Sequence, residues 1–220
     1  MLSSLREIIT ESEITLAEDP EERFITSGVS WDSYQALLVK LTDRSHYRMI
    51  YLDGVLEIVS PSIRHEKVKK NLAMLLEHFF YRQRINCIPM GSITFRDRAK
   101  QVGAEPDECY CIGVEKSIPD LAIEVNITSG SIDKLETYGR LGISEVWLWK
   151  NNELSLYHLR DTTDALSERL RQRFVDTYGY ECIVTSELLP GLDLELLSRC
   201  TLITNSLQCL DEFDRDNRDS

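Results

Sequence analysis

Residues 119–125 read PDLAIEV, in which Pro-Asp precedes a short apolar run over 121–125 that carries a single acid, Glu124. A short apolar run of this kind that follows Pro-Asp is typical of a central β-strand. Alternation along the strand places Asp120, Ala122, Glu124 and Asn126 on one face and the larger apolar side chains on the other. Glu124 therefore lies near the carboxyl end of a buried strand, where functional sites commonly form in such sheets.

Helical and strand-like segments alternate on both sides of this strand. Asp53-Gly54 predicts a hairpin over residues 47–59. Hydrophobic periodicity predicts further strands and helices. The strands are expected at 86–89, 92–96, 108–112, 146–149, 154–159, 173–178 and 181–184, and the helices at 30–41, 62–84, 132–141 and 193–213. This order predicts the α/β (α+β) class, with a mixed β-sheet flanked by helices.

The composition predicts one globular domain with a flanking segment on each side. The chain has 220 residues, of which 42% are hydrophobic and 28% charged, which is typical of a soluble protein. We expect an acidic N-terminal extension over 1–29, the folded domain over 30–197, and a C-terminal helix with a charged tail over 198–220. No apolar run is long enough to span a membrane, and we expect no signal peptide. The expected location is cytoplasmic.

The charge is unevenly distributed along the chain. The net charge of −12 disfavours a general nucleic-acid-binding protein. Residues 62–104 reverse the sign, with nine Lys or Arg against three Asp or Glu. The simple interpretation is a solvated helix face and a basic hairpin. The alternative is a surface that contacts phosphates, for which Arg64, Lys67 and Lys69 are the candidates.

A second informative acid, Asp107, follows Pro106 just before the predicted strand 108–112. A buried carboxylate is costly unless it is paired or binds a metal. A strand beginning at Asp107 could bring this carboxylate beside Glu124, and such oxygen ligands suit Mg²⁺ or Mn²⁺. The pair predicts a metal-dependent phosphodiesterase site. A nearby lysine would orient water and neutralise the transition state.

This order of Pro-Asp, an acid on a strand and then a lysine resembles the PD-(D/E)XK nuclease arrangement. Asn126 stands two positions after Glu124, where that arrangement has its lysine. The nearest lysine is Lys134, early in the following helix. Lys134 and Tyr138 are four positions apart, so both can point from one helix face.

Several segments, taken in order, resemble the Uma-two family of restriction-endonuclease-like proteins. They are YLDGVLEIVSP at 51–61 with His65, Pro106-Asp107, PDLAIEV at 119–125, Asp133-Lys134 with Tyr138, GISEVW at 142–147 and LPGL at 189–192. The resemblance implies a restriction-endonuclease-like core with Asp107 and Glu124 as metal ligands. It also implies that Lys134 substitutes for the lysine missing at position 126.

On this basis we expect a Mg²⁺-dependent (or Mn²⁺-dependent) endonuclease that hydrolyses phosphodiester bonds in DNA. Asp107, Glu124 and Lys134 are the expected catalytic residues. A homodimer is expected because restriction-like enzymes often dimerise to cut two strands. Two alternatives stay open: a non-catalytic interaction protein on a nuclease-like fold, and a metal-dependent hydrolase of another phosphate ester.

The three expected catalytic residues also have interpretations that involve no chemistry. Asp107 could simply begin a turn after proline. Glu124 could be a buried acid paired with an arginine. Lys134 could be a solvated helix residue.

Four further residues are accessory candidates: His65, Glu57, Asn126 and Tyr138. His65 could cap or pack locally instead of serving the metal site. Glu57 is expected on the exposed face of its hairpin, with a third acid at the site as the alternative. Tyr138 is expected in the core.

Overall fold

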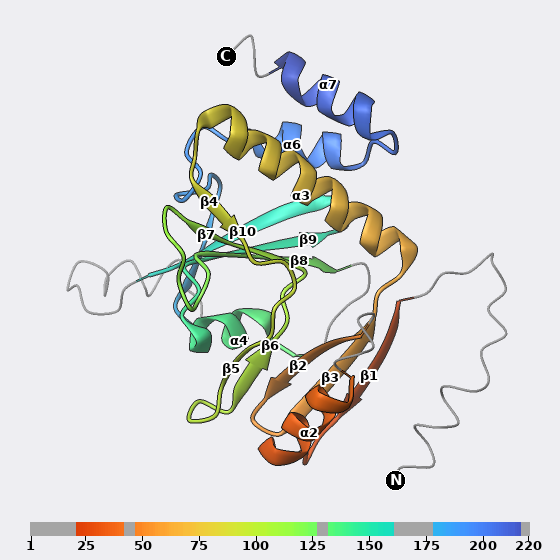
Figure 1. The fold of residues 1–220 in the computed structure, drawn as a ribbon, viewed down its shortest axis with the longest axis vertical. Coiled ribbons are helices and arrows are strands. Elements are labelled where there is room, and N and C mark those ends of the chain that lie inside the picture. The colour runs from red at the N-terminus through yellow and green to blue at the C-terminus, as the bar shows by residue number, and fades with distance from the viewer. Residues whose placement is uncertain (1–20, 42–46, 127–131, 161–177, 217–220) are drawn as a thin grey trace, which may run out of the picture.

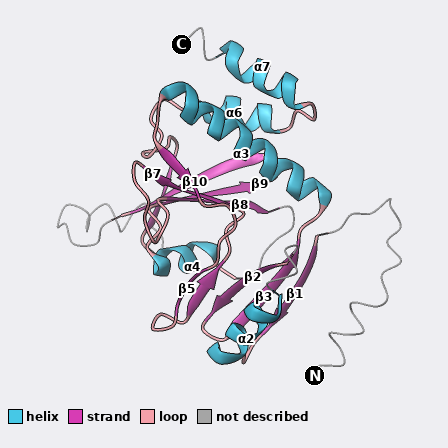
Figure 2. Cartoon of the chain, viewed as in Figure 1, coloured by secondary structure: helices cyan, strands magenta, loops and turns pink. Residues whose placement is uncertain are grey.

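The fold consists of two β-sheets and the helices that pack on them, an α+β arrangement that confirms the predicted class (Figure 2). A computed structural model describes residues 21–41, 47–126, 132–160 and 178–216. Figure 1 shows one short helix, α4 (Lys134–Leu141), between the two sheets. The strand expected at 173–178 lies almost wholly outside the described residues.

The larger sheet is mixed and has the strand order β11-β10-β9-β8-β7-β4. Its strands are β4 (Cys87–Pro89), β7 (Glu108–Ile112), β8 (Leu121–Asn126), β9 (Glu145–Lys150), β10 (Glu153–Leu159) and β11 (Tyr180–Ile183). β8 and β9 run parallel, whereas the other pairs are antiparallel. This sheet is the predicted mixed sheet, with the strand of residues 119–125 near its centre.

The two faces of β8 carry the side chains that alternation predicts. Leu121, Ile123 and Val125 pack in one hydrophobic cluster with the long helix α3 (Ile63–Gln83). Ala122 belongs to a second cluster, which contains residues of α4 and of the smaller sheet. Glu124 therefore points away from the α3 side and toward α4.

The smaller sheet is antiparallel and has the order β1-β3-β2-β6-β5. Its strands are β1 (Glu22–Thr26), β2 (Arg48–Leu52), β3 (Val55–Ser60), β5 (Phe95–Asp97) and β6 (Val102–Ala104). The predicted hairpin is confirmed, because Asp53 and Gly54 connect β2 to β3 with φ values of 46° and 83°, as a tight hairpin turn requires. β1 and β6 are strands that the sequence pattern did not indicate.

The remaining helices cover the sheets and close the chain. They are α2 (Trp31–Leu41), α6 (Leu194–Thr201) and α7 (Ser206–Asp216). The prediction of one helix over 193–213 is wrong, because the chain begins a new helix after Asn205. The Asn205 side chain accepts hydrogen bonds from the backbone N–H groups of Leu207 and Gln208, which is how an N-cap residue starts a helix.

Candidate active site

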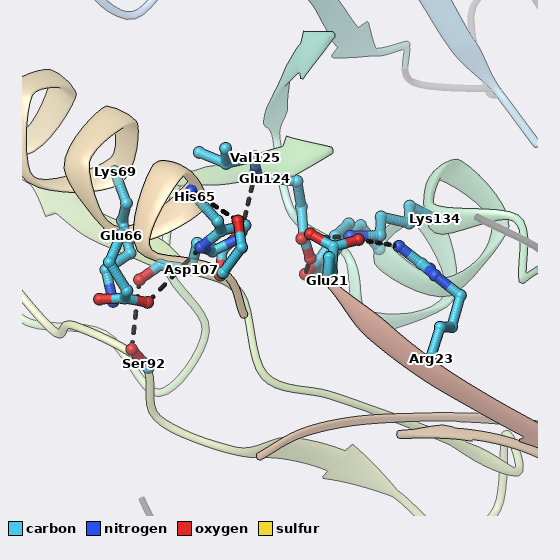
Figure 3. A network of polar contacts seen from close by, with 12 residues as sticks. Glu21, Arg23, His65, Glu66, Lys69, Ser92, Asp107, Glu124, Val125 and Lys134 are labelled. Atoms are coloured by element: carbon cyan, nitrogen blue, oxygen red, sulfur yellow. Dashed lines mark hydrogen bonds and ion pairs between the residues drawn. The ribbon is translucent and has the colours of Figure 1, made fainter. Parts of the chain in front are cut away.

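Asp107 is held at the start of β7 by two hydrogen bonds to its carboxylate (Figure 3). Its Oδ2 atom accepts from the backbone N–H of Val125 on β8 at 2.8 Å and lies 3.1 Å from Nε2 of His65. His65 comes from the first turn of α3, and its own backbone N–H donates to the N-cap residue Ser62. Both Asp107 and His65 are buried. A turn residue after proline would not need these contacts.

The charges of Asp107 and His65 stabilise each other. Burial raises the pKa of Asp107, but the hydrogen bond and charge of His65, with the charge of Lys134, lower the net pKa below its ordinary value. Burial lowers the pKa of His65, but Asp107 and, less strongly, Glu21 raise the net pKa above its ordinary value. The contact therefore favours the ionised form of Asp107 and the protonated form of His65.

Glu124 lies beside this pair and is bound by two side chains of α4. Its Oε1 accepts from the Tyr138 hydroxyl, and its Oε2 accepts from the Lys134 ammonium. Asp133 caps α4 and so fixes where Lys134 begins the helix. Burial raises the pKa of Glu124, the charge of Asp107 adds to this, and Lys134 offsets only part of the increase.

Lys134 therefore reaches the acid strand from the next helix. Lys134, Asp107 and Glu124 line one cavity of about 20 Å³. That volume holds about one water molecule or one ion. The spacing of four positions between Lys134 and Tyr138 predicted that both point from one helix face, and both do contact Glu124.

Two residues at the N-terminal strand also line this cavity, and neither was a candidate from the sequence. Glu21 directly precedes β1 and Arg23 lies within it. One nitrogen of the Arg23 guanidinium donates to Glu21 at 2.6 Å, and the other donates to Glu57. Pairing between β1 and β3 produces this contact, and no local pattern in either strand could reveal it.

Glu57 corrects an expectation. The side chain is 1% exposed and does not lie on a solvated face of the hairpin. Its second oxygen accepts from the backbone N–H of Ile132, two positions before Lys134. Glu57 thus links Arg23 to the segment that starts α4, because a buried carboxylate needs donors for both oxygens.

The remaining candidates lie farther from the cavity. Asn126 ends β8 and is not among the described residues that line the cavity. Arg64 and Lys67 are exposed on α3, and Arg64 donates to Asn152 at 3.2 Å. Lys69 is buried and paired with Glu66 at 2.7 Å, which corrects the expectation that it faces a phosphate backbone.

A comparison with protein families matches residues 31–196 to Uma2, a family described as "putative restriction endonuclease". The chain belongs to the Uma2 family. The match covers both site acids and Lys134, and it leaves Glu21 and Arg23 outside. A search of curated proteins found no match to this chain. In the described part of this Uma2 protein, no helix has the length and apolar character needed to cross a membrane.

The donor set of this Uma2 site can be compared with what a divalent metal requires. Among the described residues, no three His, Cys, Asp or Glu side chains form a group that could hold an ion. Mg²⁺ usually keeps several waters and binds through one or two carboxylates. The neighbouring carboxylates of Asp107 and Glu124 supply that number of hard ligands, and the cavity beside them has room for one ion. Mn²⁺ accepts the same ligands.

Proposed function

We propose that this Uma2 protein is an endonuclease that hydrolyses phosphodiester bonds in DNA and depends on Mg²⁺ or Mn²⁺. The observation that carries the proposal is that Asp107, Glu124 and Lys134 line one buried cavity. Two acids and a lysine are the groups that metal-assisted phosphodiester hydrolysis uses. Membership in a family described as restriction endonucleases supports the same substrate.

Each residue would have a distinct task. Asp107 and Glu124 would hold Mg²⁺, which when bound supplies a Lewis acid for the phosphate and an activated water. Lys134 would orient the attacking water and neutralise charge that develops on the phosphoryl oxygens. His65 and Tyr138 would act as positioning residues, because each donates to one of the two acids.

Cleavage of a supercoiled plasmid in Mg²⁺ tests the proposal. Asp107→Asn keeps the shape of the side chain but removes its charge, so we expect a loss of at least about 100-fold in rate. Asp211→Asn makes the same chemical change on the exposed face of α7 and should cleave like the parent protein. Equal cleavage by Asp107→Asn and Asp211→Asn would refute the proposal.

A non-catalytic interaction protein is the second candidate. It is favoured by the small cavity and by the donors that already bind both acids. A calorimetric titration with Mn²⁺ separates the two, because a nuclease site should bind Mn²⁺ at millimolar concentration or below and Asp107→Asn should weaken that binding. A panel of plasmid, single-stranded DNA, RNA and a chromogenic phosphodiester tests for other phosphate esters.

Homodimerisation is part of the proposal, since cutting both strands of a duplex calls for two sites. Sedimentation of the full chain, alone and with a short duplex, tests it. A single monomeric species under both conditions would remove this part of the proposal and leave single-strand nicking as the expected reaction.

A further inference from the structure

The N-terminal strand adds a cation and an acid to the proposed catalytic cavity. Arg23 and Glu21 line the cavity together with Glu124 and Lys134, although both precede the family match at residues 31–196. Figure 3 shows the side chains of Glu21, Arg23 and Lys134 near one another, with a dashed line from Glu21 to Arg23. A substrate phosphate that entered this cavity would therefore lie close to Arg23 and Glu21 as well as to Lys134.

Strand pairing directs Arg23 and Glu21 to the same side. β1 is antiparallel to β3, with Arg23 opposite Val59 and Glu22 opposite Ser60. Alternation sends Glu21 and Arg23 toward the cavity, while Glu22 is exposed. The side chains of Arg23 and Glu21 are only 11% and 1% exposed. The pair is thus part of the buried site and not a surface ion pair.

The contact between Arg23 and Glu21 has the chemistry of phosphate recognition. A guanidinium binds carboxylate and phosphate oxygens with the same planar donors. Arg23 donates one such bond to Glu21 at 2.6 Å and another to Glu57. The cavity beside them measures about 20 Å³, which is too little space for a phosphodiester group while Glu21 stays in place.

The acids around the cavity differ in the tasks and contacts that can be assigned to them. Four carboxylates line the cavity, from Glu21, Glu105, Asp107 and Glu124. Asp107 and Glu124 are the proposed metal ligands, and Glu105 accepts hydrogen bonds from Met49 and Thr94. Glu21 is the acid paired with Arg23, and its negative charge would repel an incoming phosphate.

We propose that Arg23 binds the phosphodiester of the DNA substrate and that Glu21 occupies the position of that phosphate in the substrate-free protein. This inference rests on the proposed function, because it assigns a phosphate-binding residue to the same site. Glu21 thereby competes with substrate, and β1 contributes a phosphate-binding residue that lies outside the family match.

Metal-free binding of a fluorescent 12-base-pair duplex by the full chain tests this inference without requiring catalysis. Glu21→Gln should tighten binding about tenfold, because it removes a like charge beside the phosphate. Glu22→Gln is the matched control, since it makes the same change one residue away on the exposed side and should shift affinity less than about twofold.

The salt dependence of duplex binding is a second readout for Arg23. Removing Arg23 would not change it if the role of Arg23 were purely structural. Arg23→Gln should make the negative slope of log affinity against log salt shallower by about 0.9, as expected for one lost phosphate contact. Arg23→Lys should keep that slope with weaker binding, because it retains the charge and loses the planar donors. Circular dichroism verifies that each variant still folds, since both substitutions remove the guanidinium partner of Glu57.

Three results of the duplex-binding measurements would overturn the inference. They are equal affinities of Glu21→Gln and Glu22→Gln, a parental salt slope in folded Arg23→Gln, and no detectable duplex binding by any variant. Weaker Mn²⁺ binding in Glu21→Gln would also overturn it, by making Glu21 a metal ligand. If Glu21→Gln binds tighter and no protein cleaves DNA in Mg²⁺, the inference stands and the endonuclease proposal fails. If the parent cleaves and Glu21→Gln matches Glu22→Gln, only the inference fails.

Discussion

Two buried glutamates on neighbouring strands, Glu124 of β8 and Glu145 of β9, accept hydrogen bonds from different kinds of donor. Glu145 is fully buried and accepts from the Trp147 indole at 2.7 Å and the His158 ring at 3.3 Å. The backbone N–H groups of residues 187 and 188 also donate to it. Glu124 is also buried, but it accepts from the side-chain groups of Lys134 and Tyr138 and faces the cavity.

The difference in donors separates a structural acid from a candidate site. Burial raises the pKa of Glu145, but hydrogen bonds from the His158, Ser186 and Trp147 side chains and from the Leu188 backbone bring the net pKa below its ordinary value. Glu124 faces a cavity and keeps a raised pKa, which burial causes first and the charge of Asp107 increases. Perturbation of this kind beside a cavity is typical of functional sites.

The largest expected effect tests the structural half of this comparison. Glu145→Ala leaves the Trp147 indole and two backbone N–H groups buried without an acceptor. We expect the free energy of unfolding in urea to fall by about 3–5 kcal/mol. Glu115→Ala, on an exposed loop, should change it by less than about 0.5 kcal/mol. A loss under about 1 kcal/mol for Glu145→Ala would mean that these hydrogen bonds add little.

The next effect tests the functional half. Glu124→Gln should reduce Mg²⁺-dependent plasmid cleavage at least about 100-fold, because the amide binds the metal weakly. Glu145→Gln keeps one acceptor oxygen and lies away from the cavity, so its cleavage rate, measured at a temperature where it is folded, should stay within about threefold of the parent. Similar losses in both variants would contradict the division between the two acids.

The sequence predicted those parts of the fold and site that depend on local pattern. Alternation over residues 121–125 assigned both faces of β8, and Asp53-Gly54 located the hairpin turn. The convergence of Asp107 and Glu124 followed from two adjacent strands. Lys134 was identified as the substitute lysine through the family resemblance, and its contact with Glu124 is now explained by the cap at Asp133.

The parts that escaped prediction depend on long-range pairing. β1 is a five-residue edge strand whose site residues are set by its register with β3. From the sequence alone the register is unknown, so Glu57 is expected on the exposed face of its hairpin and the partner of Arg23 cannot be predicted. Lys69 escaped for a related reason, since its burial depends on how α3 packs. The break before α7 was locally readable, because Asn205 is a strong N-cap residue.

The smallest expected effect is a difference in sign between the two acids as pH changes. The folded protein lowers the pKa of Glu145 below its ordinary value of 4.5, since hydrogen bonds outweigh the opposing effect of burial. Its ionisation therefore stabilises the fold above pH 4.5, and this stabilisation is lost as pH falls through the folded pKa. The advantage of the parent over Glu145→Gln in free energy of unfolding should shrink as pH falls from about 5 through the folded pKa.

Glu124 should behave in the opposite way. Burial raises its pKa above the ordinary value of 4.5, so the folded state binds the proton more tightly than the unfolded state. Ionisation then costs stability, so the free energy of unfolding of the parent should fall relative to that of Glu124→Gln as pH rises from 4.5 through the folded pKa. Urea unfolding across this range, with exposed Glu115→Gln as a flat reference, measures both trends. Curves of the same sign for the two variants would show that Lys134 and Tyr138 stabilise the Glu124 anion as fully as fixed donors stabilise Glu145, and the contrast between a structural and a functional acid would then rest on the cavity alone.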